Sequence, residues 1–165
     1  MRNSEAYATL QQELTLAMEH VQGQYEKYLD MKRRSRVTET PEEIVIAAIG
    51  FSLHNLYNAM ENYFLRISKF FENELSRDSW HRDLVNRMAL SIEGVRPALL
   101  DRETLKPFQE LRAFRHVFRT IYDSTLEPRK VALVEEEAPN AVEILEKAHV
   151  GYLAKLGEIR RGLES

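Results

Sequence analysis

The chain has 165 residues, with 26 acidic and 23 basic side chains and a formal net charge of -3. A chain of this length lies in the usual range of one domain, so we expect a single domain over residues 1–165. The near balance of charges gives no general attraction to nucleic acid or membranes, so an anion site would be a local patch. The absence of cysteine excludes disulfides, thiolate nucleophiles and cysteine-bearing zinc sites, and it fits a reducing compartment.

Hydrophobic residues occur in short runs only. The N-terminal segment lacks the apolar stretch of a secretory signal, and the longest apolar run, residues 44–51, is too short to cross a bilayer. We therefore expect a soluble, cytoplasmic protein without a membrane partner.

The first helix is predicted from Ser4 to Lys32, because apolar residues recur there every three, four or seven positions. This stripe consists of Tyr7, Leu10, Leu14, Val21, Tyr25 and Tyr28. The basic segment 31–40 interrupts the pattern. Thr40, followed by Pro41 and two glutamates, then predicts an N-cap, a proline at the first helical position and a second helix. The second helix extends to Phe71 and is apolar around more of its circumference, so we expect it to be central.

The third helix is predicted from the residues that would cap and close it. Asp78 or Ser79 supplies the N-cap, and Gly94 and Pro97 close the segment. The fourth helix is predicted from about Pro107 to Tyr122.

The last helical stretch runs from Lys130 to Leu163, with a kink or break at Pro139. No alternating apolar pattern of strand length and no internal repeat occurs anywhere in the sequence. The predicted fold is therefore an all-α, up-and-down bundle of four to five helices.

The fourth predicted helix has two distinct faces when its residues are spaced at about 100°. The apolar face holds Leu111, Phe114, Phe118 and Ile121. The neighbouring cationic face holds Arg112, Arg115, His116, Arg119 and Tyr122. Because the planar guanidinium fork suits phosphate, this face predicts an anion site, with Arg112 and Arg119 as phosphate- or RNA-binding residues. The alternative is a face of charged side chains that are simply solvated.

Three segments of the sequence also carry a resemblance to a known family. They are SLHNLYNAMENYFLRI, SWHRDLVNRMALSIEGVRPALL and LRAFRHVFRTIY. Together they resemble the HepT-like branch of the HEPN superfamily, over roughly Glu42 to Gly157. Members of that superfamily are helical bundles, mostly homodimers, and many are metal-independent ribonucleases that act as toxins paired with a nucleotidyltransferase antitoxin. The resemblance implies a homodimer, RNA or a nucleotide as ligand, a nucleotidyltransferase antitoxin as partner, and no cofactor.

The family motif is an arginine, a polar residue, three further residues, a histidine, one more residue and a tyrosine. It aligns here with Arg115, His116, Thr120 and Tyr122, so the position of the catalytic histidine holds Thr120. By resemblance, Arg115 holds the phosphate and Tyr122 is the residue that the antitoxin modifies with AMP. A threonine hydroxyl does not titrate near neutral pH, so we expect weak or lost ribonuclease activity.

Three functions stay open at this point. The favoured one is a HepT-like protein of a toxin-antitoxin type system that binds RNA or a nucleotide, with weak or lost ribonuclease activity. The alternatives are an active metal-independent ribonuclease that uses His116 as its base, and a purely structural helical dimer. His116 is also interpreted as the polar partner that orients Arg115. Neither His54 nor His81 stands in a metal-ligand spacing, so no metal site is predicted.

Overall fold

The computed structural model describes residues 2–72, 80–121 and 125–165, apart from the side chains of residues 80–82. Its helices are α1 (Ser4–Val37), α2 (Glu42–Phe71), α3 (Trp80–Met88), α4 (Lys106–Thr120) and α5 (Pro128–Glu164), with a 3-10 turn at Arg102–Thr104. No strand forms within these ranges. The predicted all-α class is therefore confirmed. The predicted caps Asp78 and Ser79 lie outside the described residues.

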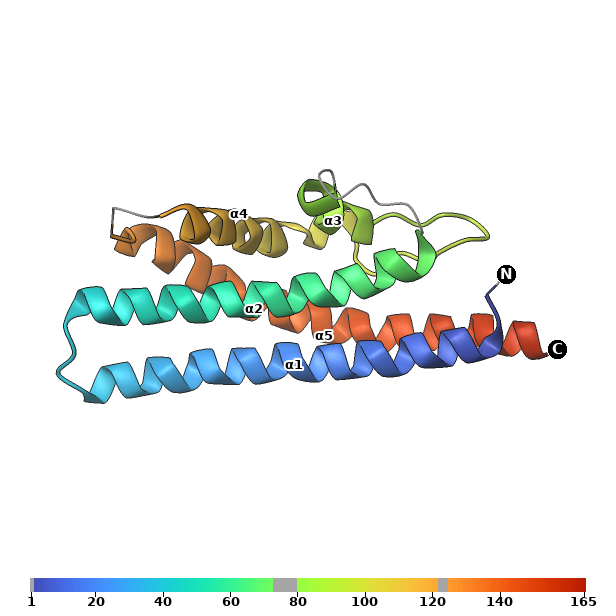
Figure 1. Cartoon of the computed structure of the whole chain (residues 1–165), viewed down its shortest axis with the longest axis horizontal. Coiled ribbons are helices and arrows are strands. Elements are labelled where there is room, and N and C mark those ends of the chain that lie inside the picture. The colour runs from blue at the N-terminus through green and yellow to red at the C-terminus, as the bar shows by residue number, and fades with distance from the viewer. Residues whose placement is uncertain (1, 73–79, 122–124) are drawn as a thin grey trace.

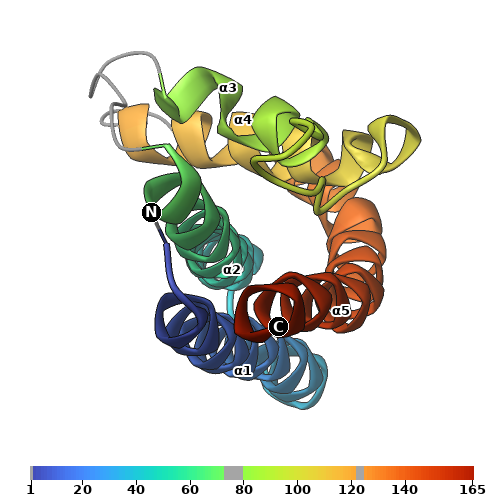
Figure 2. The ribbon, with the colours of Figure 1, turned by 90° about the vertical axis from the view of Figure 1, so that its right-hand side faces the viewer.

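Helix α2 is the centre of the bundle, as its apolar circumference predicts. It packs against each of the other four helices. Figure 1 shows α1, α2 and α5 lying lengthwise beside one another, and Figure 2 shows α3 and α4 on one side of α2 with α1 on the other. The α2 side chains that are at most 1% exposed are Leu53, Leu56, Tyr57, Ala59, Met60, Tyr63, Phe64, Ile67 and Ser68. Hydrophobic burial around this one helix thus holds the domain together.

Helix α1 is longer than its apolar stripe predicts. The helix was expected to end at Lys32, but it continues through the basic segment to Val37. Asp30 pairs with both Arg33 and Arg34, at 3.5 and 2.9 Å, across one turn. Ion pairs at this spacing support a helix, and cations near the C-terminus interact favourably with the helix dipole. Local electrostatics therefore extends α1 by more than one turn.

The start of α2 differs from its predicted cap. The residue before the helix is Pro41 rather than Thr40, and no side chain caps the first turn. The Thr40 hydroxyl instead lies 3.0 Å from the hydroxyl of Thr38. The two threonines thus bond to each other between the helices, and Glu42 and Glu43 supply the negative charge at the helix N-terminus.

Helix α5 runs through Pro139 without a break, although the proline cannot donate a backbone hydrogen bond. In Figure 1 the earlier part of α5 runs obliquely and the later part lies along α1, which is the kink that an internal proline predicts. Ala138, directly before Pro139, and Val142, three residues after it, are both buried in the core. Packing therefore holds the helix together across the missing bond.

Helix α3 ends at Met88, earlier than Gly94 and Pro97 predict. The chain then turns at Gly94, where φ is +71°, and the backbone of Ile92 pairs with that of Arg96. Arg96 is 3% exposed, and its guanidinium donates to Glu72 at 2.7 Å and to the carbonyl oxygens of Arg87 and Leu90. Glu72 also binds Arg87. One carboxylate thus joins the end of α2 to α3 and to the turn that follows it.

We expect Glu72→Gln to lower the free energy of unfolding by about 3 kcal/mol, because it leaves the buried Arg96 guanidinium without a counter-charge. Urea denaturation followed by circular dichroism measures this loss. The matched control is Glu143→Gln, which breaks an exposed ion pair with Lys147 on α5. Glu143→Gln should lower the free energy of unfolding by only a small fraction of the loss in Glu72→Gln, because an exposed ion pair is hydrated in both the folded and the unfolded chain. Equal losses in the two variants would show that the Glu72 cluster has no special weight.

Candidate functional site

Helix α4 packs against α2 and α5 through its apolar face, as predicted. Phe108, Leu111 and Phe114 are buried, and Phe118 is partly buried. Helix α4 begins at Lys106 with Pro107 in its first turn, where the missing N–H of proline costs nothing. This packing holds the cationic residues of α4 at the edge of the contact with α2.

The C-terminus of α4 comes earlier than the sequence predicts. The helix ends at Thr120, whose hydroxyl donates to the carbonyl oxygens of His116 and Val117 at 3.0 and 3.3 Å. Ile121 then takes an extended conformation, with φ -87° and ψ 98°. The side chain at the histidine position of the motif therefore bonds to its own helix. Tyr122 lies outside the described residues, so its place beside Arg115 stays a prediction.

Arg115 points into the bundle rather than out to solvent. Its Nε donates to Oδ1 of Asn58 at 2.6 Å, and its Nη2 lies 3.4 Å from Oε1 of Glu61. The side chains of Arg115 and Glu61 are 18% and 8% exposed. Both partners belong to α2, so the first residue of the motif ties α4 to the central helix.

Asn58 connects Arg115 to His54. Because the Asn58 oxygen accepts from Arg115, its amide nitrogen faces Nε2 of His54 at 3.1 Å. Nε2 of His54 then accepts this hydrogen bond from Asn58. This assigns His54 as a neutral ring with its proton on Nδ1. The His54 ring also stacks on Phe118, with centroids 4.9 Å apart. Burial, and then the charges of Arg115 and Arg119, lower the pKa of His54, in agreement with a neutral imidazole.

The other predicted residues divide between the surface and the helix boundary. His116 and Arg119 are exposed, whereas Arg112 is partly buried. The Nε of Arg112 and the hydroxyl of Tyr57 are both buried and have no hydrogen-bond partner among the described residues. Burial, followed by the charge of Glu61, raises the pKa of Tyr57, so this hydroxyl remains a donor. Two buried donors near α4 thus have no acceptor among the described residues.

The structure places Asn58 and Glu61 in the role that the sequence suggested for His116. These two residues, and not His116, make the described contacts with Arg115. A signal for them exists in the sequence: His54, Asn58 and Glu61 recur at spacings of four and three on a helix that is otherwise apolar. Polar residues on the buried face of a central helix require partners, and a basic helix face elsewhere supplies them.

No group of three or more acidic or histidine side chains in the described ranges is arranged to hold a metal ion. Among the same residues, no helix is long and apolar enough to cross a membrane.

We expect the free energy of unfolding to fall as the pH is lowered through the ordinary histidine pKa of about 6.5. The lowered pKa of His54 means that the folded chain binds this proton less readily than the unfolded chain does. Burial lowers the pKa of His149 as well, so the variants are compared with the wild type. Urea denaturation gives the free energy of unfolding at about pH 7.5 and at about pH 5.5. The difference between these two free energies should be smaller in His54→Gln than in the wild type.

The control for this experiment is His20→Gln, which removes an exposed histidine of α1. It should retain the pH dependence of the wild type. A His54→Gln variant with an unchanged pH dependence would contradict the neutral imidazole at this site.

One comparison with known proteins identifies a family for this chain. The model of the HepT-like protein family matches residues 48–156, which is more than half of the chain and includes α3 and α4 entirely. Searches of curated proteins and of solved structures found no match. The matched region contains the Arg115 contacts, the Thr120 position and the Tyr122 position, whereas α1 lies outside it. The chain therefore belongs to the HepT-like family of the HEPN superfamily.

Proposed function

We propose that the chain is a HEPN protein of toxin-antitoxin type that binds RNA or a nucleotide along α4 and cleaves RNA weakly or not at all. The observation that carries this proposal is Thr120. Its hydroxyl stands at the motif position of the histidine and donates to backbone carbonyls of its own helix. A group so engaged does not exchange a proton with a substrate.

The chemistry of RNA cleavage explains why the residue at position 120 is decisive for activity. Without a metal, cleavage needs a base for the 2′-hydroxyl, an acid for the leaving oxygen, and a cation on the phosphorane. Proton transfer by a positioned side chain typically contributes about 10²- to 10⁴-fold in rate. The cations are present in this chain, but the motif histidine is not, so binding is supported better than cleavage.

Phosphate binding is supported by the cations that line α4. Arg119 is exposed, and Arg112 carries a buried Nε without a described acceptor. Arg115 is held by Asn58 and Glu61, so its position does not depend on a ligand. A preorganised guanidinium between two further arginines suits a phosphodiester, because little freedom is lost on binding.

The active ribonuclease is the second candidate, and the exposure of His116 is the observation that favours it. His116 lies one turn before Thr120 on α4, and its carbonyl accepts the Thr120 hydroxyl. An exposed imidazole at this place is accessible to a bound RNA. His54 is less suited, because its Nε2 accepts from Asn58 and its Nδ1 is buried. The third candidate, a purely structural helical dimer, needs neither histidine.

The proposal includes two partners. One is a second copy of the chain, and the other is a nucleotidyltransferase antitoxin that would modify Tyr122 with AMP. AMP on this tyrosine adds negative charge two residues after Thr120, near the arginines of α4. Such a group would compete with RNA for the same cations.

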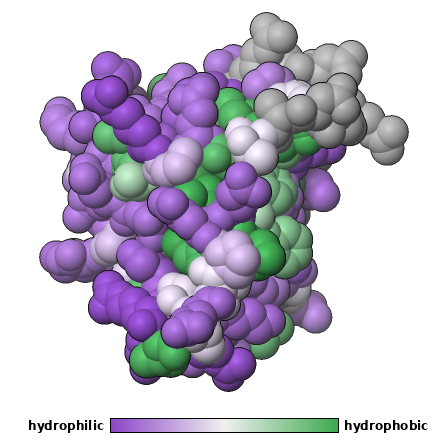
Figure 3. Space-filling view, turned by 90° about the vertical axis from the view of Figure 1, so that its left-hand side faces the viewer, coloured by the Kyte–Doolittle hydropathy of each residue, from purple (hydrophilic) through white to green (hydrophobic). Residues whose placement is uncertain are grey.

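Support for the homodimer comes from apolar surface beside α4. Phe51 and Ile44 of α2 are 56% and 58% exposed, and the Phe51 ring lies 6.5 Å from that of Phe118. A hollow of about 530 Å³ lies next to them, lined in part by Phe118 and Ile121. Figure 3 shows hydrophobic patches among hydrophilic side chains at the end of the molecule where α4 ends and α5 begins. A two-fold contact here would bring both α4 helices to one cleft.

We expect Thr120→His to raise ribonuclease activity at least about 100-fold, because it restores a group that titrates near neutral pH. The assay measures cleavage of a labelled RNA in the presence of a chelator. Thr125→His is the matched control, since it adds the same side chain at another exposed threonine. That variant should remain as inactive as the wild type.

Two other outcomes select the alternatives. If the wild type already cleaves RNA in chelator and His116→Ala abolishes the cleavage, the chain is an active ribonuclease with His116 as base. If the wild type neither cleaves RNA nor binds it with a salt-dependent affinity, the structural dimer is favoured.

We expect light scattering at micromolar concentration to give the mass of a dimer. Phe51→Glu should shift the chain to the monomer, because it places a charge in the centre of the apolar contact. Val150→Glu on α5, at a position that is 70% exposed, is the control and should remain dimeric. A monomeric wild type would remove the dimer from the proposal.

A further inference from the structure

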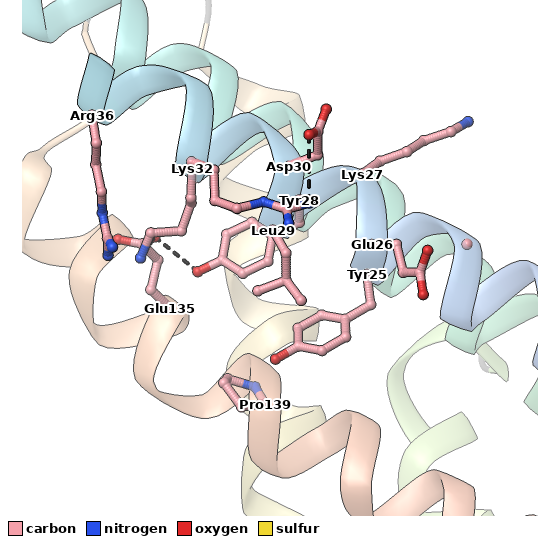
Figure 4. Close-up of a pocket in the computed structure, with 12 residues that line it drawn as sticks. Tyr25, Glu26, Lys27, Tyr28, Leu29, Asp30, Lys32, Arg36, Glu135 and Pro139 are labelled. Carbon is pink, nitrogen blue, oxygen red and sulfur yellow. Dashed lines mark hydrogen bonds and ion pairs between the residues drawn. The ribbon is translucent and has the colours of Figure 1, made fainter.

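A second hollow lies on the other side of the bundle from α4. It has a volume of about 950 Å³ and lies between the second half of α1 and the region of α5 around Pro139. Figure 2 shows α1 and α4 on opposite sides of α2, and Figure 4 shows the side chains that line the hollow. The α1 side of this groove lies outside the residues that the HepT-like family matches. We call this hollow the α1–α5 groove.

The floor of the α1–α5 groove is apolar and partly aromatic. Tyr25 and Pro139 lie across from each other, with Leu29 beside them (Figure 4). Leu29 is 39% exposed although it is a large apolar residue. The Tyr25 ring stacks on that of Tyr28 at a centroid distance of 5.9 Å and an interplanar angle of 24°. The floor is therefore apolar and partly aromatic, and the Tyr25 ring packs on a second, buried ring.

Hydrogen bonds and ion pairs hold the floor in place. The Tyr28 hydroxyl donates to Glu135 at 2.8 Å, and Tyr28 itself is 2% exposed. Lys32 binds the same carboxylate at 2.8 Å. Since Glu135 already has two partners, it does not neutralise the remaining cations of the groove. The site is thus formed before any ligand arrives.

The end of the groove towards the C-terminus of α1 is cationic. Residues 27–36 contain five basic side chains and a single acidic one, Asp30. Asp30 pairs with Arg33 and Arg34 together, so it balances one of them at most. Arg36 lines the groove and has no ion pair among the described residues. This end therefore retains unbalanced positive charge within an acidic protein.

The apolar and cationic parts follow one another along a single helix face. Tyr25, Leu29 and Arg36 recur at spacings of four and seven, which places them on one side of α1. Arg33 follows Leu29 by one turn, about 6 Å along the helix. A ligand that extends along α1 would thus contact the apolar floor first and the guanidinium groups directly after it.

We propose that the α1–α5 groove binds a nucleotide unit, with its base over Tyr25, Leu29 and Pro139 and its phosphate on Arg33 and Arg36. Bases stack on aromatic side chains whatever their sequence, and the arginine fork binds phosphate through two parallel hydrogen bonds. An acidic peptide would engage the arginines but would leave the apolar floor without a partner.

This site goes beyond the proposed function, which assigns ligand binding to α4. The nucleotide unit has two sources, a free mononucleotide or one residue of a single-stranded RNA. Both present a base and a phosphate to the groove, so they share its recognition. Only the RNA would extend beyond it.

The test uses the full chain and two probes, AMP and a fluorescent 12-nucleotide polyuridine RNA. The groove variant is Arg33→Gln with Arg36→Gln, which removes two exposed cations and leaves Tyr25 and Tyr28 in place. The matched control is Lys155→Gln with Arg161→Gln, which removes two exposed cations of α5 away from both sites. Circular dichroism checks that each variant is folded. Calorimetry measures AMP binding, and anisotropy measures RNA binding over a range of salt concentrations.

We expect the groove variant to bind its probe at least about tenfold more weakly, because two charged hydrogen-bond donors are lost. If RNA is the ligand, the slope of log affinity against log salt should also fall by about 1.4, at 0.7 for each phosphate contact of a single strand. A loss for AMP alone identifies the free nucleotide as the ligand. The control variant should bind as the wild type does.

The same measurements on Arg112→Gln with Arg119→Gln separate this inference from the proposed function. If only that α4 variant loses RNA binding, the proposed function stands and the groove assignment is wrong. If only the groove variant loses binding, the groove assignment stands and the α4 assignment fails. Equal losses of affinity in the groove and control variants would show that binding depends only on net charge, and would overturn the groove assignment. A wild type that binds neither AMP nor the RNA would overturn it as well.

Discussion

The Arg115 guanidinium crosses from α4 to α2 and binds Asn58 and Glu61 inside the bundle. A charge at this depth must keep its partners, because an unpaired guanidinium out of water is costly by several kcal/mol. The contact therefore fixes the rotation of α4 about its own axis. With Arg115 turned inward and Phe114 buried next to it, His116 and Arg119 are turned to the surface. Together with the apolar packing of α4, this contact determines which of the described site residues face the solvent.

The basic residues of the chain have different roles because their burial differs. Arg96 and Arg115 lie inside and are matched by Glu72 and by Asn58 with Glu61, so they connect helices. Arg119 of α4 and the arginines of residues 33–36 on α1 are exposed and have fewer partners of this kind. Exposed cations such as these are more accessible to an anion from outside than a guanidinium that is paired inside the bundle. The formal charge of the chain, -3, conceals this division.

Membership of the HepT-like family and the state of its motif are separate matters in this chain. The family match and the helical bundle depend on apolar packing that no single motif residue controls. Catalysis depends on one titratable group at one place. Thr120 illustrates that family membership and the motif are separate. Helix α4, which carries the motif, forms and packs as expected, whereas the Thr120 hydroxyl donates to a backbone carbonyl of the same helix. The fold is thus maintained with a threonine at the histidine position of the motif.

The sequence by itself determined the helical class, the central place of α2, the apolar faces of α1 and α4, and the family. Each of these follows from the spacing of apolar residues along one helix, which is a local property of the chain. The tertiary structure decided what the spacing does not contain. It turned Arg115 towards Asn58 and Glu61, which are 57 and 54 residues away, and it gave the α1–α5 groove its two walls.

Helix ends were also decided outside the local pattern. Helix α1 continues to Val37, with Asp30 paired to two arginines of this extension, and α4 ends at Thr120, two residues before the end that the sequence predicts. A periodic pattern defines which side of a helix is buried, but the hydrogen bonds and ion pairs at each end determine its length. These bonds join residues within about one turn, whereas the contact of Arg115 with Asn58 joins residues far apart in the chain, which meet only because the packed core brings α2 and α4 together.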